Sequence, residues 1–431
     1  MRTINVGVIG FGTIGSGVAE VLLKKRRALR IKSGVDLNLK MVCDKDIASK
    51  REVRVKKGLL TKDADRILHD PEIEIVVELI GGIHPAKEII MKALMNDKDV
   101  VTANKALLCE EGENLFDYAA RAGRSIKFEA SVGGGIPIIK ALKESLIAND
   151  IQAIYGIVNG TSNYILGSME SDKCGFKEAL LRAKKLGVAE RNAALDVSGA
   201  DSAHKLALLA LLGFGKGVTL KDIYVEGITA VEPCDMEYAK DLGYSIKLLA
   251  VAKRLRDELE LRVHPTLVDR DHPLAAVRGV NNAIFVKGDL VGESLFYGKG
   301  AGRYPTTSAV VSDIIDLARS IAHGAFSQGD TMRFKNGINK IRPIEKISSR
   351  YYIRLQAIDR PGVLASIASI LARHKISIAS VRQVERRSQH VVPIVMLTHD
   401  ALEKSMAAAL RDIGRLSSIK YKPVAIKIER L

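Results

Sequence analysis

The sequence predicts an α/β chain with three parts: a doubly wound parallel sheet, an α+β middle segment, and a smaller ferredoxin-like unit at the C-terminal end. Three observations lead to this fold class. Residues 3–136 alternate short β-rich runs with helical stretches, a pattern typical of repeated βαβ units. A glycine-rich turn joins the first run to the first helix. The last part, from about residue 351, follows the order β-α-β-β-α-β.

The first strand and helix enclose a candidate cofactor site. The apolar run Thr3–Ile9 leads directly into G-x-G-x-x-G and then into a stretch with helical periodicity. In a Rossmann-type dinucleotide-binding turn, the first glycine permits the turn, the second admits a pyrophosphate and the third allows close helix packing. The helix N-terminus adds N–H donors and positive dipole. A plain turn is the alternative. The expected cofactor-binding residues are Gly10, Phe11, Gly12, Thr13, Ile14 and Gly15.

The remaining elements of this part follow in order. The further candidate strands are Leu37–Cys43, Ile73–Ile80, Val100–Thr102 and Ser125–Ala130, and the helices are Thr13–Ala28, Pro85–Asn96 and Glu113–Ala122. Ligands of doubly wound sheets lie beyond the carboxyl ends of the strands. The loops at residues 81–82, 103–105 and 131–135 should therefore line the nicotinamide end.

The residues after the second strand leave the cofactor open between NAD and NADP. Asp44 stands where an acid would bind the ribose 2′-hydroxyl of NAD, whereas Lys45 and Arg51 could accommodate the 2′-phosphate of NADP. Asp44 and Lys45 are expected cofactor contacts in either case. The basic residues favour NADP slightly.

The middle part, from Ile138 to about Gly324, has an α+β pattern. The candidate helices are Phe176–Leu186, Ala203–Gly213 and Met236–Arg254, and the strands are Gln152–Val158, Leu261–Leu267, Ala283–Lys287 and Ser294–Tyr297. A polar stretch near residues 328–348 follows and is predicted to be a linker.

The segment from Ala183 to Lys205 carries the second candidate site. It places Glu190, Asp196, Asp201 and Lys205 at intervals of six, five and four residues. On a helix beginning near Asp201, that residue and Lys205 would share one face. A lysine beside carboxylates can donate a proton to a developing alkoxide, and carboxylates can anchor an ammonium group. A solvated helix start with an i,i+4 salt bridge is the alternative.

Composition limits the classes of partner. The chain has a net charge of +16, of which fifteen basic and six acidic residues after position 348 contribute +9. These charges are dispersed along strand and helix patterns and tryptophan is absent, so we expect a solvated basic surface and no nucleic acid partner. The longest apolar stretches are too short for a membrane span. The cysteines lack C-x-x-C spacing, which favours reduced thiols over disulfides or a zinc site. No signal peptide is expected either, and we therefore predict a cytoplasmic protein.

The C-terminal part is predicted to be ferredoxin-like. Its expected elements are Tyr351–Ile358, Leu364–His374, Ser377–Gln383, Val391–Thr398, Ala401–Ile413 and Val424–Ile428. Asp359-Arg360-Pro361-Gly362 places a turn before the first of its helices, which suits binding of a carboxylate at the helix N-terminus. A simple strand-to-helix cap is the alternative.

Eight motifs in order resemble the homoserine dehydrogenase family, in its bacterial form with a C-terminal ACT regulatory domain. They are GFGTIGSGV (10–18), VVTANKALL (100–108), FEASVGGGIPI (128–138), GIVNGTSNYIL (156–166), the 183–205 stretch, HPTLV (264–268), YGKGAGRYPTTSAV (297–310) and DRPGVLA (359–365). The implied domains are a Rossmann domain at 1–136, a catalytic, substrate-binding and dimerisation domain at 137–325, a linker at 326–348 and an ACT domain at 349–431.

The resemblance also implies roles for individual residues. Lys105 and Lys205 match the two catalytic lysines, and Glu190, Asp196 and Asp201 match the acids that hold the substrate, with Asp201 also assigned to catalysis and Lys205 to substrate binding. Gly302 and Thr307 fall where the family touches its cofactor, as does Lys105. The sodium site of the family matches Glu129 with the carbonyls of Val132, Gly134 and Ile136. One departure is Asn192-Ala193, where the family usually has Asp-Pro, and it is expected to loosen this turn.

The implied reaction is the reversible NAD(P)H-dependent reduction of L-aspartate 4-semialdehyde to L-homoserine, in threonine, methionine and isoleucine biosynthesis. The resemblance further implies allosteric feedback by threonine through the ACT domain, and a homodimer or homotetramer. Two alternatives are an aspartate-semialdehyde dehydrogenase that uses Cys109 as nucleophile, and an amino-acid sensor whose front domains are relics.

Overall fold

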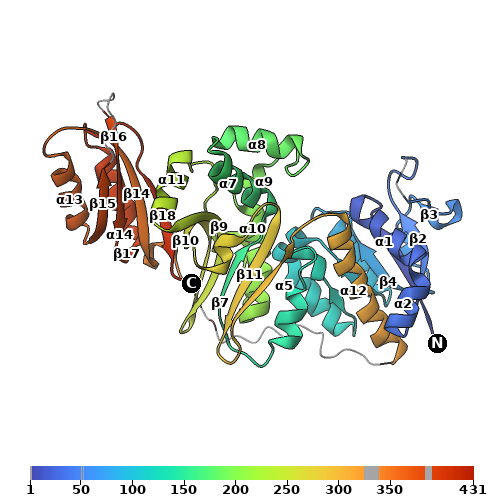
Figure 1. Ribbon diagram of the computed structural model, residues 1–431. Helices are drawn as coiled ribbons and strands as arrows, with labels where there is room; N and C mark the ends of the chain where they lie inside the picture. The colour runs from blue at the N-terminus through green and yellow to red at the C-terminus, as the bar shows by residue number, and fades with distance from the viewer. Residues whose placement is uncertain (1, 50, 52, 325–337, 339, 384–390) are drawn as a thin grey trace. The chain divides into compact units, whose positions relative to one another are not determined.

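The computed structural model describes residues 2–49, 51, 53–324, 338, 340–383 and 391–431 (Figure 1). The described chain forms two compact units. The first contains residues 2–151, 204–220 and 282–324, and the second contains residues 152–203, 221–281 and the described residues from 338 onward. Each unit therefore collects segments that lie far apart in the sequence. The predicted division into three domains and a linker stays a prediction.

A six-stranded parallel sheet forms the centre of the first unit. Its strand order is β3-β2-β1-β4-β5-β6, the doubly wound arrangement that binds dinucleotides where the order reverses. The strands are β1 (Thr3–Ile9), β2 (Asp36–Cys43), β3 (Leu60–Thr61), β4 (Ile73–Glu78), β5 (Asp99–Thr102) and β6 (Ile126–Lys127). The predicted parallel sheet is confirmed, since every neighbouring pair in it is parallel.

Helices cover both faces of this sheet. They are α1 (Thr13–Lys24), α2 (Arg26–Ser33), α3 (Asp65–Leu68), α4 (Ala86–Met95), α5 (Lys105–Arg121) and, from much later in the chain, α12 (Arg303–Ala322). Figure 1 shows α12 beside α1, and their apolar residues share one core with β1 and β2. Burial of Val310, Ile314 and Leu317 in that core explains why a helix from position 303 completes the dinucleotide-binding fold.

Several local differences from the predicted elements have physical reasons. The expected helix Thr13–Ala28 is divided at Lys25 into α1 and α2. The helix α5 begins at Lys105, eight residues before the predicted start, because Asn104 caps it through a bond from the Leu107 N–H to its side chain. After the short strand β6, the chain turns into a 3₁₀ segment at Glu129–Ser131. The helices α3, α7 (Gly160–Asp172) and α12 were not predicted, and α2 was predicted only over residues 26–28.

The second unit is built on a mixed sheet. Its strands follow the order β7-β9-β10-β18-β14-β16-β15. The first three are β7 (Ile151–Ile157), β9 (Tyr244–Leu255) and β10 (Glu258–Asp269), and the helices beside them are α7, α8 (Phe176–Lys185), α9 (Ala194–Val197) and α11 (Pro233–Asp241). The neighbouring strands β11 (Asn281–Gly288) and β12 (Gly292–Lys299) belong, from Asn282 onward, to the first unit. The helix α10 (Ala200–Phe214), which carries Asp201 and Lys205, begins in the second unit and continues from His204 in the first.

The predicted helix Met236–Arg254 was wrong over most of its length. Helix α11 ends at Asp241, and Gly243 follows with a φ of 85°, a conformation that glycine adopts readily. Residues 244–255 are the strand β9, which pairs antiparallel with β10 along its whole length. Residues 245–252 are all buried. A run that is buried on both sides has no alternation of exposed and buried residues that would distinguish a strand from a buried helix.

The C-terminal part has the predicted β-α-β-β-α-β order. Its elements are β14 (Ser348–Ile358), α13 (Val363–Arg373), β15 (Ile378–Gln383), β16 (Val391–Thr398), the short β17 (Ala401–Leu402), α14 (Glu403–Gly414) and β18 (Val424–Glu429). Both helices pack on one sheet around their own core. The edge strand β18 pairs in parallel with β10, so this part continues the sheet of the middle segment.

The described end of the predicted linker is not wholly irregular. Residues 340–341 form the short strand β13, which pairs with β10, and a 3₁₀ turn follows at Ile344–Lys346. The predicted linker residues 326–337 and 339 lie outside the described residues. Among the described helices, none combines the length and apolar character that a membrane span requires.

Candidate active site

The glycine-rich turn has the geometry that a bound pyrophosphate needs. A side chain at Gly10 would come within 2.7 Å of the Leu79 carbonyl, and one at Gly15 within 1.8 Å of the Gly10 carbonyl oxygen. Around Gly12, in contrast, nothing lies within 4 Å of the position a Cβ would take. Close packing therefore requires glycine at positions 10 and 15, and the turn is open at Gly12, where a phosphate would approach the start of α1.

Two charged residues stabilise this turn. The Asp44 carboxylate accepts hydrogen bonds from the Phe11 N–H at 2.5 Å and from the Asp46 N–H at 2.8 Å. Arg51 donates from Nε to the Phe11 carbonyl at 2.9 Å, and its guanidinium lies 5.9 Å from the centre of the Phe11 ring. Asp44 therefore fixes the turn as well as standing at the end of β2.

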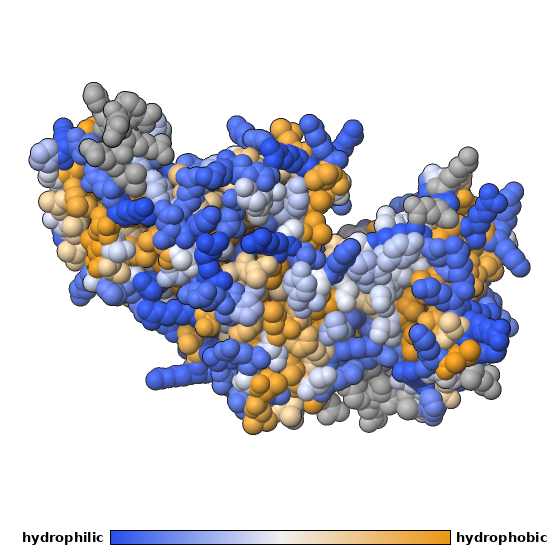
Figure 2. All heavy atoms as spheres, in the orientation of Figure 1, coloured by the Kyte–Doolittle hydropathy of each residue, from blue (hydrophilic) through white to orange (hydrophobic). Residues whose placement is uncertain are grey.

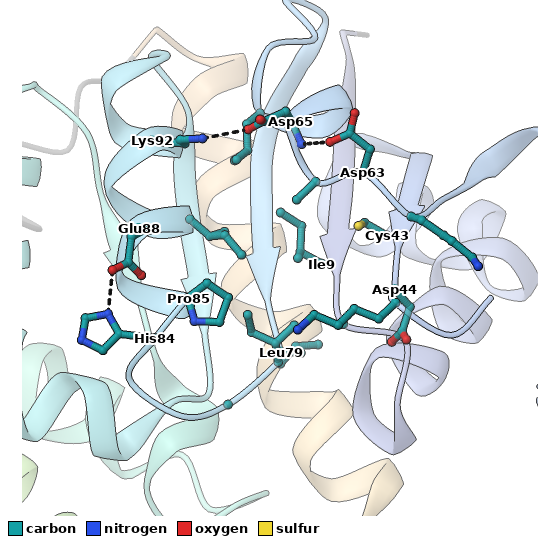
Figure 3. Close-up of a pocket in the computed structure, with 18 of the residues that line it drawn as sticks. Ile9, Cys43, Asp44, Asp63, Asp65, Leu79, His84, Pro85, Glu88 and Lys92 are labelled. Atoms are coloured by element: carbon teal, nitrogen blue, oxygen red, sulfur yellow. Dashed lines mark hydrogen bonds and ion pairs between the residues drawn. The ribbon is translucent and has the colours of Figure 1, made fainter.

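A cavity of about 670 Å³ opens beside this turn (Figure 3). Its walls include Gly10, Gly12 and Asp44 from the first two strand ends, and the loop residues Leu79, Ile80 and Gly81. Two exposed lysines, Lys45 and Lys62, also line it. Lys62 was missed at the sequence level because it follows β3, a two-residue strand with no periodicity to detect. Burial and the neighbouring Asp44 raise the pKa of the Cys43 thiol in this wall to about 11, so it stays protonated at neutral pH.

The acidic residues of the second candidate site meet at one amide. Asn159 caps α7, where its side-chain oxygen accepts a hydrogen bond from the Ser162 N–H at 2.7 Å. The two N–H groups of the same side chain donate to Asp196 at 2.7 Å and to Asp201 at 2.8 Å. The structure therefore brings these two predicted acids together, as the spacing alone could not show. Asn159 was not predicted to be a site residue, although it lies within the GIVNGTSNYIL motif.

Glu190 lies on the segment between α8 and α9 and is exposed. Leu186 and Leu195, which flank this segment in sequence, are 66% and 62% exposed. Figure 2 shows apolar side chains among the polar ones on the surface over α8. The turn expected to be loosened by Asn192 is held, because the Asn192 side-chain oxygen accepts a hydrogen bond from the Ala194 N–H at 3.2 Å. Asn192 thus supplies the acceptor that an aspartate would supply there.

The two predicted catalytic lysines each lie near the start of a helix. Lys205 lies one turn after Asp201 on α10, and the two residues are 9% and 8% exposed. Lys105 is the first residue of α5 and is half-buried. Burial argues against the alternative of a solvated salt bridge for Asp201 and Lys205, because such a pair would be expected on an open helix surface.

The predicted sodium-binding segment is a tightly packed turn. The Glu129 carboxylate accepts hydrogen bonds from the N–H groups of Ile139 at 2.9 Å and Lys140 at 2.8 Å. Gly134 has a φ of 57°, and a side chain there would come within 2.5 Å of the Gly300 carbonyl. The carboxylate thus fixes the start of the following helix, and backbone carbonyls are the oxygens of this segment best suited to a cation.

The last two predicted cofactor contacts lie at and within α12. Gly302 precedes the helix with a φ of 119°. Thr307 is 1% exposed and packs against α1, where a side chain at Gly17 would come within 2.3 Å of its hydroxyl. Thr307 thus holds α12 on α1, and its contact with a cofactor stays a prediction.

Comparisons with known proteins agree with this arrangement. A homoserine dehydrogenase family model matches residues 137–315, a model of the homoserine dehydrogenase NAD binding domain matches 10–129, and an ACT domain model matches 351–417. The homoserine dehydrogenase of Helicobacter pylori is 42% identical over 431 residues and that of Neisseria gonorrhoeae is 40% identical over 434, with at least 99% of each chain covered.

Solved structures give the same result. The crystal structure of a homoserine dehydrogenase from Thiobacillus denitrificans matches with a TM-score of 0.92 and 41% identity, over 100% of this chain and 99% of that one. A hyperthermophilic archaeal homoserine dehydrogenase, solved in complex with NADPH, matches with a TM-score of 0.64 and 26% identity, over 74% and 98% of the two chains. On the full-length identity and the family models together, the chain belongs to the homoserine dehydrogenase family.

Proposed function

We propose that this chain catalyses the reversible reduction of L-aspartate 4-semialdehyde to L-homoserine with a nicotinamide cofactor. The observation that carries the proposal is the arrangement around Asn159, whose amide binds Asp196 and Asp201 one helical turn from Lys205. Two carboxylates beside a lysine suit a substrate that has both an ammonium group and an oxygen that gains charge during reaction.

Each residue of the proposed site has its own role in the reaction. The cofactor, when bound, supplies or accepts the hydride. Lys205 donates a proton to the alkoxide oxygen as it forms, and Lys105 adds positive charge at the nicotinamide end. Asp201, held by Asn159, orients Lys205, while Asp196 and the exposed Glu190 bind the substrate ammonium group. Asn159 keeps both aspartates in place without adding charge.

The lining of the cavity favours NADP over NAD. Lys45 and Lys62 place two cations on its wall, and Arg51 lies against the glycine-rich turn. Asp44 already accepts two backbone N–H groups, which balance part of its charge toward a 2′-phosphate. The cofactor contacts proposed for Gly302 and Thr307 would come from the region where α12 begins.

Sodium is proposed to bind the carbonyls of the 129–136 turn. Carbonyl oxygens suit a hard monovalent cation. The Gly135 N–H donates to the Lys299 carbonyl at 3.1 Å and the Ile136 N–H to the Gly133 carbonyl at 3.0 Å, so the turn has a fixed shape. The carbonyls of Val132, Gly134 and Ile136 would contribute ligands, together with Glu129.

Regulation is proposed to act through the ACT domain, with threonine as the effector. Helix α13 begins after Gly362, which has a φ of 87°, and no side chain caps its N-terminus. An effector carboxylate could bind there. The position of a Cβ at Gly362 is open, with nothing within 4 Å, so a substituent would project into the approach.

A physical route links this domain to the substrate acids. The Lys427 ammonium lies 4.9 Å from the centre of the Tyr224 ring. Tyr224 and Val225 form β8 on the same edge of β10 that β18 uses. Two residues further on, a side chain at Gly227 would come within 2.3 Å of the Val197 carbonyl, at the end of the helix α9 that carries Asp196. Movement of β18 would therefore be transmitted to α9.

The proposal places the enzyme in the cytoplasm, as a homodimer or homotetramer, in the synthesis of threonine, methionine and isoleucine. The test is a dehydrogenase assay of the purified full-length chain with L-homoserine and each oxidised nicotinamide cofactor. Homoserine-dependent formation of the reduced cofactor would support it, and absence of that reaction with both cofactors would exclude it.

A further inference from the structure

A buried hydrogen-bond network joins the two loops at the carboxyl ends of β4 and β5. It consists of Glu78, the last residue of β4, Thr102, the last residue of β5, and Asn104, the N-cap of α5. Glu78 and Thr102 are 0% exposed and Asn104 is 7% exposed. Lys105 follows Asn104 directly.

Hydrogen bonds of this network connect the ends of the neighbouring strands β4 and β5. The Thr102 hydroxyl donates to the Glu78 carboxylate at 2.6 Å and accepts from the Asn104 N–H at 3.0 Å. The other Glu78 oxygen accepts from the Ile80 N–H at 2.8 Å and from the Gly81 N–H at 3.3 Å. The loop after β4 is thus held from its own strand.

Asn104 holds the same loop from the other side. Its Nδ2 donates to the Gly82 carbonyl at 2.6 Å, while its Oδ1 accepts from the Leu107 N–H at 3.2 Å. One side chain therefore fixes both the loop at Gly81-Gly82 and the first turn of α5. Gly81 and Gly82 both have positive φ, at 73° and 74°, a conformation that glycine adopts readily, so the loop can follow the tight path that these hydrogen bonds hold.

The chemistry of Glu78 points to function rather than to stability. A fully buried carboxylate is costly, and Glu78 is satisfied by neutral donors rather than by an ion pair within the described chain. An apolar residue at the end of β4 would cost less. A buried polar residue where an apolar one would be more stable is expected at positions that hold a functional site in place.

We propose that Glu78, Thr102 and Asn104 are positioning residues that set the place of Lys105 relative to the loop over the cofactor cavity. The inference rests on the proposed dehydrogenase function. Leu79, Ile80 and Gly81 line the cavity, so the network connects the cavity wall directly to Lys105. Misplacement of a catalytic group by about 1 Å can cost on the order of 10²-fold in rate.

Two substitutions separate positioning from folding. Asn104→Asp keeps the oxygen that caps α5 but replaces the donor to Gly82 with an oxygen that repels its carbonyl. Thr102→Val removes the hydroxyl with little change in volume, whereas Thr102→Ser keeps it. We expect kcat for homoserine oxidation to fall by roughly 10- to 100-fold in the first two and to stay within about threefold of wild type in Thr102→Ser, with KM for homoserine nearly constant.

Matched controls come from two residues that belong neither to the network nor to the cavity lining. Asn96→Asp removes an Nδ2 donor to the Lys92 carbonyl at the end of α4. Thr398→Val removes a buried hydroxyl that accepts from the Tyr351 N–H in the ACT domain. Both should keep the wild-type kcat even if they lower thermal stability as much as the test variants do.

Binding of NADPH gives a readout independent of turnover. Asn104→Asp and Thr102→Val should change the fluorescence of the bound nicotinamide while its dissociation constant changes less than about fivefold, since the glycine-rich turn and Asp44 are untouched. The proposal is overturned if both variants keep more than half of the wild-type kcat and the same fluorescence, or if Thr102→Ser is no better than Thr102→Val. Absence of homoserine oxidation in the wild type would instead reject the proposed function, and nicotinamide fluorescence would still test the network.

Discussion

Replacing Arg354 by methionine should be among the most destabilising single changes in the second unit. Arg354 lies on β14 and is 4% exposed, and it donates from Nε to Asp235 at 2.7 Å and from Nη2 to the other carboxylate oxygen at 3.2 Å. Asp235 is fully buried at the start of α11 and also accepts from the Tyr352 hydroxyl at 2.8 Å. This cluster therefore fastens the ACT domain to the middle segment.

The magnitude follows from burial. Removing one partner of a buried ion pair leaves an uncompensated charge and costs about 3–5 kcal/mol, whereas an exposed pair contributes about 0–1 kcal/mol. The chain contains a matched exposed pair between the same two parts, Arg382 on β15 with Asp241 at the end of α11, at 2.9 Å and with both side chains 50% exposed. Arg382→Met removes the same side chain without the buried charge.

The assay is urea unfolding of both variants and the wild type, followed by circular dichroism. The free energy of unfolding should fall by about 3–5 kcal/mol in Arg354→Met and by less than about 1 kcal/mol in Arg382→Met. A double replacement, Arg354→Met with Asp235→Leu, should recover much of the loss because no buried charge remains. Equal losses in the two single variants would refute the reasoning from burial.

Four further predictions follow from the site and the network around it. Lys205→Ala should lower kcat by roughly 10²-fold or more with nearly unchanged cofactor affinity, and a variant that keeps a third of kcat would remove Lys205 from proton transfer. Lys62→Gln should weaken NADPH binding several-fold and leave NADH binding unchanged; a tenfold preference of the wild type for NADH in kcat/KM would contradict the NADP assignment. Millimolar threonine should inhibit the wild type but not Gly362→Asp, by a coupling of about 1–3 kcal/mol, and an insensitive wild type would point to another effector. Burial lowers the pKa of His264 well below its usual value, so the unfolded chain takes up a proton there first and stability should fall as the pH drops below about 6.5; His264→Gln should flatten that loss in unfolding experiments between pH 7 and 5.

A point substitution is a better test of regulation than deletion of the ACT domain. Deleting the ACT domain would remove β18 from the edge of β10 and leave Arg262 without Glu429, its partner at 2.9 Å. Arg262 is 1% exposed, so such a deletion would expose a buried charge in the middle segment. Substitution at Gly362 leaves β18 and Glu429 in place, and its cost is limited to the backbone strain of a side chain at a φ of 87°, because nothing lies within 4 Å of the Cβ position.

The parallel sheet and the glycine-rich turn could be predicted because their signals are local. Strand Thr3–Ile9 is followed directly by the glycines whose positions the close contacts at Gly10 and Gly15 require. The helix predicted over residues 236–254 failed because a fully buried run has no periodicity, and pairing with the next strand, β10, makes it β9.

The site itself was only partly predictable. Asp196, Asp201 and Lys205 are near neighbours in sequence, so their types and spacing were visible. The roles of Asn159 and Glu78 were not visible, because they depend on hydrogen-bond partners that only folding brings close. Asn159 and Asp196 are 37 residues apart in sequence, and Glu78 and Thr102 are 24 apart. Lys62 reaches the cavity wall because it follows β3, and a strand of two residues has no sequence pattern that would predict it.

The central claim is that this chain oxidises homoserine with Lys205 as the group that exchanges the proton. The most direct measurement is the initial rate of cofactor reduction by L-homoserine, for the wild type and Lys205→Ala side by side, with NADP and with NAD. We expect homoserine-dependent reduction by the wild type and a rate at least 10²-fold lower in the variant. A wild type without activity on either cofactor, or a variant as fast as the wild type, would contradict it.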